Sequence, residues 1–217
     1  MNTDTTKKPW DGLLASVIVR PLIPTAITPN HLTTLRLAVG LAAALVVAHG
    51  GQSWLVAGTL LYILSNFIDH TDGALARSRG THSEWGAVYD QWCDGLVQVL
   101  VFAGIGIGLR ESWLGLAAPV VGVVFAVAVA CIFIINARGE KTIGNEASDQ
   151  PTFAGFEIED VLYLVPLVAV FGWLPFFIVS GSIGAPIYLS WSVWRQRRLQ
   201  IATSAAQSTD SSPDAGA

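Results

Sequence analysis

Four aspartates in one short stretch are the residues of this sequence best suited to chemistry: Asp69, Asp72, Asp90 and Asp94. On continuous helices the first two, three residues apart, share one face, and the last two, four residues apart, share another. Two such faces can converge, and like charges that lie close together need a compensating cation. Carboxylate ligands without Cys or His in register favour Mg²⁺ or Mn²⁺ over Zn²⁺. We therefore expect these aspartates to bind one or two such ions, with two as the expected number.

Small residues accompany the carboxylates. Gly73 and Ala76 follow the first pair on the same expected helix, and Gly86 lies four residues before Asp90. Small side chains beside a metal site leave space for a phosphate or a nucleotide, and the planar guanidinium of Arg77 is suited to phosphate oxygens. The alternative is that the glycines serve only close packing of helices, which is common in membranes.

The elements that must position these residues are membrane helices. Of the 217 residues, 52% are hydrophobic and only 13% are charged, which is outside the usual range of soluble domains. The sequence predicts an all-α membrane protein with six transmembrane helices preceded by an amphipathic surface helix. The second and third spans must continue past the hydrocarbon to carry the aspartates. The apolar runs that predict the six spans cover residues 35–48, 54–68, 96–109, 113–135, 161–171 and 174–194.

Three segments are expected. Residues 1–30 form an N-terminal cytoplasmic segment, in which residues 10–22 read as the surface helix or, alternatively, as an ordinary linker. Residues 31–199 form the six-helix domain, and the small, polar residues 200–217 form a disordered cytoplasmic tail.

Charge sets the expected orientation. Nearly all Lys and Arg residues fall in segments on one side of the six-span arrangement, so the positive-inside rule predicts cytoplasmic termini and a cytoplasmic active site, in a bacterial inner membrane. The net charge of -4, without a basic cluster, argues against nucleic acid as a partner. Cys93 and Cys131 are far apart in sequence and indicate neither a zinc site nor a disulfide framework.

The positions singled out above fill one pattern, Asp-x2-Asp-Gly-x2-Ala-Arg-x8-Gly-x3-Asp-x3-Asp. This stretch resembles the signature of the CDP-alcohol phosphatidyltransferase family. The segment from Thr28 to Leu37 also resembles the family's usual entry into its first span. The resemblance implies transfer of a phosphatidyl or related phospho group from a CDP-activated lipid, such as CDP-diacylglycerol, to a small polar alcohol. CMP is released, and the reaction belongs to phospholipid biosynthesis.

The resemblance also implies residue roles. Asp69, Asp72 and Asp90 would hold the metals, and Asp94 would complete the metal site and act as the general base. CDP would be bound by the first two aspartates together with four further residues: Gly73, Ala76, Arg77 and Gly86. The resemblance further implies a homodimer.

The acceptor site is expected in the polar loop after residue 135. Arg138 and Lys141 would suit an inositol phosphate or glycerol phosphate, whereas Asp160 and its acidic neighbours would suit a polyol or a cationic alcohol. These charges could also be ordinary solvated loop residues.

Two other functions stay open from the residues alone. A metal-ion transporter would also place aspartates in membrane helices, although here the aspartates gather at one membrane face and the middles of the apolar runs contain no acid. A hydrolase would use the same catalytic groups to direct water, in place of an alcohol, to the same phosphorus.

Overall fold

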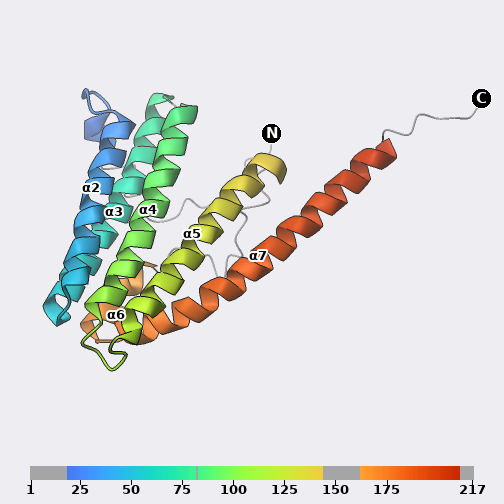
Figure 1. Cartoon of the computed structure of the whole chain (residues 1–217). Helices are drawn as coiled ribbons and strands as arrows, with labels where there is room; N and C mark the ends of the chain where they lie inside the picture. Colours follow the sequence, from blue (N-terminus) through green and yellow to red (C-terminus); the bar gives the residue numbers. More distant parts are fainter. Residues whose placement is uncertain (1–18, 82, 144–161, 211–217) are drawn as a thin grey trace, which may run out of the picture.

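The computed structural model describes residues 19–81, 83–143 and 162–210, and within them every regular element is helical. The first four long helices alternate in direction along the chain, whereas the fourth and the fifth run in the same direction (Figure 1). In chain order the elements are the 3₁₀ turn η1 (Arg20–Leu22), α2 (Pro29–His49), α3 (Gln52–Arg79), α4 (Glu84–Gly108), α5 (Ala117–Ile143), α6 (Val165–Val170) and α7 (Leu174–Asp210).

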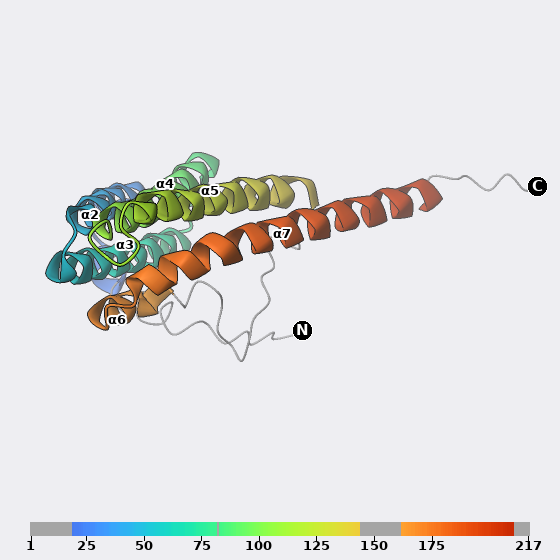
Figure 2. The same cartoon turned by 60° about the horizontal axis from the view of Figure 1, so that its bottom comes forward.

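Helix α2 is the centre of the part of the bundle that carries the aspartates. It packs against both α3 and α4, whereas α3 and α4 hardly touch each other. Helix α5 packs on α4 and α7, and α6 packs on α3. The start of α2, the end of α3 and the start of α4 meet at the upper end of Figure 1, which we call the motif end. Figure 2 shows that α7 runs away from the bundle in its C-terminal half.

In the part of the chain that the structure describes, four helices are long and apolar enough to cross a membrane, as expected for a multi-pass, helical membrane protein. Their membrane-compatible parts are Pro29–His49, Glu84–Gly108, Ala117–Gly139 and Leu174–Ile201. The 28 residues of α3 measure about 42 Å, which is enough to cross, but its second half carries the polar motif residues. The six residues of α6 measure about 9 Å and cannot cross alone. The six-span count therefore stays a prediction.

The chain ends differ from expectation where they are described. Helix α7 continues to Asp210, so the helix extends beyond residue 199, where the six-helix domain was expected to give way to a disordered tail. The Ala and Gln residues of this stretch are good helix formers, which explains the continuation. Residues 211–217 and most of the expected surface helix, residues 10–18, lie outside the described residues.

The ends of the helices at the motif end are fixed by local signals. Thr28 caps α2 in a capping box with His31, and Pro29 occupies the first turn. Helix α3 ends at Gly80, whose left-handed backbone (φ 63°) glycine adopts without strain. Ser83 then caps α4 by accepting from the Gly86 amide. The end of α3 and the start of α4, which lie between the two aspartate pairs in the sequence, are therefore both well defined.

Glycines allow the long helices to approach closely below the motif end. A Cβ atom added to Gly58 of α3 would lie 2.8 Å from the backbone nitrogen of Val47 on α2. One added to Gly106 of α4 would lie 2.7 Å from the Cα atom of Gly122 on α5. These close approaches leave little freedom for one helix to slide past another. The register that brings the aspartates together is thus fixed along the whole bundle.

We predict that Gly104→Ala destabilises the protein, because the new Cβ atom would lie 2.6 Å from the carbonyl oxygen of Ala44 on α2. Overpacking of this kind costs about 1–3 kcal/mol, which lowers the unfolding midpoint of a chain this size by about 5 °C. Thermal unfolding in detergent measures the change. Gly184→Ala is the control, because no atom lies within 4 Å of the added Cβ. Equal midpoints for the two variants would contradict the close approach.

Candidate active site

A single buried arginine joins the two aspartate pairs. Arg36 of α2 is only 1% exposed. Its Nη1 atom pairs with Asp69 Oδ1 of α3 and lies 2.8 Å from Asp90 Oδ1 of α4. Its Nη2 atom lies 2.7 Å from Asp94 Oδ1, also on α4. One guanidinium therefore contacts three carboxylates from two helices that barely touch each other.

The fourth aspartate is held one turn closer to the end of the bundle. Thr33 lies three residues before Arg36 on the same face of α2, and its hydroxyl donates to Asp72 Oδ2 at 2.8 Å. One turn deeper, the Ser65 hydroxyl of α3 donates to the carbonyl oxygen of Arg36 at 3.0 Å. Successive turns of α2 thus meet successive turns of the antiparallel α3, and this register aligns Asp69 with Arg36 and Asp72 with Thr33.

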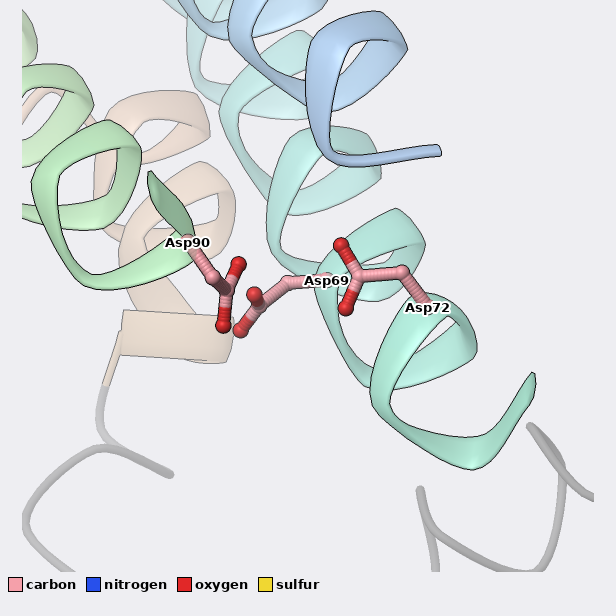
Figure 3. A group of neighbouring side chains, drawn as sticks. All are labelled: Asp69, Asp72 and Asp90. Carbon is pink, nitrogen blue, oxygen red and sulfur yellow. The ribbon is translucent and has the colours of Figure 1, made fainter. Parts of the chain in front are cut away.

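Three of the carboxylates are arranged as metal ligands. One oxygen from each of Asp69, Asp72 and Asp90 lies within 4.8 Å of the others. Figure 3 shows Asp69 between the other two, with its carboxylate directed toward Asp90 across the gap between α3 and α4. The predicted convergence of the two helix faces is therefore present, in a group drawn from both helices. Asp94 joins this group through Arg36, one turn further along α4.

The donor set fits a hard divalent cation. The three grouped ligands are all carboxylates, which suits Mg²⁺ or Mn²⁺. Arg36 contacts Oδ1 of three aspartates, and the Oδ2 atoms are outside these ion pairs. If all four aspartates are ionised, one arginine leaves three negative charges without compensation. The residues present therefore fit one or two divalent ions, as the sequence predicts, with the number still a prediction.

The small residues lie on the same helices as the carboxylates, Gly73 and Ala76 on α3 and Gly86 on α4. A Cβ atom on Gly73 would lie 3.2 Å from Nη1 of Arg77, so the exposed Arg77 side chain folds back over the glycine. A Cβ atom on Gly86 would lie 2.8 Å from the Ser83 hydroxyl and 3.3 Å from Oδ1 of Asn30. Ala76 is half-buried. The absence of a side chain at Gly86 thus leaves room for the capping Ser83 and for Asn30 at the start of α2. The CDP contacts of Gly73, Ala76, Arg77 and Gly86 stay predictions.

The predicted acceptor residues are only partly described. Arg138 is exposed near the end of α5, and this end lies at the motif end of the bundle (Figure 1). Lys141 lies one turn later on α5. Asp160 lies outside the described residues. Their common site therefore stays a prediction.

Arg36 and Thr33 are the functional residues that sequence reasoning missed. In the sequence, Arg36 stands out only as one of the Lys and Arg residues that the positive-inside rule counts. The available signal was the spacing of Thr33 and Arg36, which matches the three-residue spacing of Asp69 and Asp72 on the antiparallel neighbour. Without knowledge of which face of α2 meets α3, this match has no special weight.

Comparison with known proteins identifies the family. The sequence profile of the CDP-alcohol phosphatidyltransferase family matches residues 26–194, a range that contains all four aspartates and Arg36. The chain belongs to this family.

Curated relatives share part of the sequence. The phosphatidylinositol phosphate synthase of Mycobacteroides abscessus is 31% identical over 129 residues, which cover 59% of this chain and 56% of the relative. The archaetidylinositol phosphate synthase of Pyrococcus horikoshii is 33% identical over 96 residues, which cover 44% of this chain and 50% of the relative. The matched stretch thus spans about half the length of these relatives.

Solved structures share the fold. The phosphatidylinositol phosphate synthase of Mycobacterium tuberculosis with CDP-DAG bound has a TM-score of 0.62 at 24% identity, and covers 84% of this chain and 94% of its own. The same protein in complex with manganese and citrate has a TM-score of 0.60, and covers 83% of this chain and 88% of its own. At this identity the likeness shows the fold.

We predict that Asp90→Asn weakens Mn²⁺ binding by more than about tenfold, because it removes the α4 ligand from the group shared with α3. Titration of the purified protein in detergent, followed by Mn²⁺ electron paramagnetic resonance, measures the affinity. Glu111→Gln is the control, because this exposed carboxylate lies just past the far end of α4. The same affinity in both variants would exclude the group as the metal site.

Proposed function

We propose that this protein transfers a phosphatidyl group from a CDP-activated lipid, such as CDP-diacylglycerol, to the hydroxyl of a small polar alcohol, with release of CMP. The observation that carries the proposal is the group formed by Asp69, Asp72 and Asp90, in which the family's signature residues from two helices bring their oxygens within 4.8 Å. The names of the relatives and the CDP-DAG bound to a structural neighbour support a CDP-lipid donor.

Each residue of the site has a proposed role. Asp69, Asp72 and Asp90 hold the divalent ions and Asp94 completes the site, as we propose. When bound, these ions neutralise the pyrophosphate and stabilise CMP as the leaving group. The small residues Gly73, Ala76 and Gly86 leave room for the nucleotide, and the exposed fork of Arg77 binds a phosphate of CDP.

Asp94 is proposed as the general base. Its Oδ1 atom is paired with Arg36, and its second oxygen is outside that ion pair. A carboxylate held in place by one oxygen can accept the proton of the attacking hydroxyl with the other. The oxygen of the alcohol then attacks the lipid-side phosphorus, the bond to CMP breaks, and a phosphodiester is formed.

We propose a phosphorylated polyol as the acceptor. The relatives are named as inositol phosphate lipid synthases, and the exposed Arg138 lies near the end of α5 at the motif end, where it can attract a phosphate. Lys141 would add a second cation, and Asp160 would bind hydroxyl groups. We further propose a homodimer in a bacterial inner membrane, with six spans, a surface helix before them, and termini and active site in the cytoplasm. The distribution of Lys and Arg supports this orientation.

A panel of acceptors tests the reaction. Purified protein with CDP-diacylglycerol and Mg²⁺ or Mn²⁺ is given inositol 1-phosphate, inositol, glycerol 3-phosphate, serine or choline, and CMP and lipid mass are measured. We expect CMP and a new phosphodiester lipid only when both metal and a phosphorylated polyol are present. CMP with phosphatidic acid and no acceptor would identify a hydrolase. Metal flux into vesicles without CMP would identify a transporter.

We predict that Asp94→Asn lowers turnover by about a hundredfold or more but retains CDP-lipid binding, because the amide keeps the size of the side chain and loses the proton acceptor. General bases contribute about 10²- to 10⁴-fold to rates, so a loss within this range is expected. CMP release and binding of CDP-lipid are measured separately. Glu84→Gln, an exposed residue in the first turn of α4, is the control with unchanged turnover. Lost binding with unchanged rate per bound complex would overturn the role of Asp94.

A further inference from the structure

We propose that Arg36 is a permanent counter-charge of the metal site, a positioning residue that holds the carboxylates of α3 and α4 together when no metal is bound and works against metal binding. The inference rests on the metal site of the proposed function, but it does not depend on the transfer reaction. It concerns the free energy of the site with and without a cation.

The first support is the one-sided burial of the cluster. Arg36 is 1% exposed, whereas the side chains of Asp69, Asp90 and Asp94 are 27%, 40% and 30% exposed. The arginine thus lies on the closed side of the cluster, and the carboxylates are accessible from the other side. A cation can approach the aspartates from the open side without passing Arg36.

The second support is the choice of oxygen atoms. Each of the three ion pairs uses Oδ1 of the aspartate, so Arg36 touches one edge of each carboxylate. A carboxylate has a second oxygen that can bind a metal at the same time. The metal group and Arg36 therefore share Asp69 and Asp90, with no need for the arginine to leave.

The third support is that the backbone of Arg36 is fixed by packing and that its buried charge is paired with the aspartates. Its backbone carbonyl accepts from Ser65, and one turn later Gly40 packs so tightly on α4 that an added Cβ atom would lie 2.5 Å from Val97. Its Nε and Nη2 atoms have no hydrogen-bond partner among the described residues, so the side chain is held by its ion pairs with the carboxylates and not by a full set of hydrogen bonds. A buried guanidinium without the aspartates would be an uncompensated charge.

Two effects of opposite sign follow for the loss of this charge. Without metal, Asp69, Asp90 and Asp94 would lose their shared partner, and the protein would be less stable. With metal bound, loss of the Arg36 guanidinium would remove the repulsion between this cation and the metal ions. Because unfolded chains lack the site, a variant that is harmed more without metal than with metal must bind metal more tightly.

The test compares Arg36→Gln, which removes the charge, with Arg36→Lys, which keeps it. Thermal unfolding is measured in EDTA and in saturating Mn²⁺, and Mn²⁺ affinity is measured by electron paramagnetic resonance. For Arg36→Gln we expect the midpoint in EDTA to fall by about 10 °C, most of this loss to be restored by Mn²⁺, and the Mn²⁺ affinity to rise at least about tenfold. For Arg36→Lys we expect both quantities to lie between the wild-type values and those of Arg36→Gln.

Arg79→Gln is the matched control. Arg79 of α3 donates to four backbone carbonyls before α2, those of Leu22, Ile23, Thr25 and Ile27, and thus holds structure without touching the aspartates. Its loss should lower the midpoint equally in EDTA and in Mn²⁺, and leave the Mn²⁺ affinity unchanged.

If Arg36→Gln also lowers the midpoint equally in EDTA and in Mn²⁺, or if it binds Mn²⁺ more weakly than the wild type, the inference is overturned. Arg36 would then only support the fold. Wild-type protein that binds no Mn²⁺ would overturn both the inference and the metal site of the proposed function. If the wild-type protein binds Mn²⁺ but Arg36→Gln shows neither the lower midpoint in EDTA nor the higher Mn²⁺ affinity, the inference alone is overturned.

Discussion

The ion pairs of Arg36 with Asp69 on α3 and with Asp90 and Asp94 on α4 connect two helices that hardly touch each other. Helix α2 therefore determines how far apart the two aspartate pairs lie. Gly58 of α3 and Gly104 of α4 pack closely against α2 and fix its position away from the motif end. At the motif end its position is fixed by the hydrogen bond from Thr33 to Asp72. The site is thus a property of three helices, although its signature residues lie on two.

Charge explains why the site must lie at an end of the bundle. Several carboxylates in the bilayer interior would be costly, whereas at a helix end they can be reached by cations and by a charged nucleotide from water. The apolar faces of α2 and α4 suit contact with lipid. A CDP-lipid likewise has apolar acyl chains in the membrane and a charged nucleotide in water. A site at the end of the bundle therefore suits the proposed donor.

The grouping of aspartates from α3 and α4 could be predicted from the sequence, because the relevant geometry is local. Spacings of three and four residues place Asp69 with Asp72 and Asp90 with Asp94 on single helix faces, whatever the tertiary structure. Arg36 was missed because its role depends on which face of α2 meets α3 and α4, and this is decided by packing. The six-span count does not follow from apolar runs alone, because motif residues make the second half of α3 polar and α6 has only six residues.

The central claim is that α2 unites the carboxylates of α3 and α4 into one metal site. Anomalous diffraction from crystals of the protein grown with Mn²⁺ tests it most directly, since manganese is located without reference to any assumed ligand. The account predicts an anomalous peak bounded by Asp69, Asp72 and Asp90. Manganese bound elsewhere, with no peak among these three carboxylates, would contradict the account.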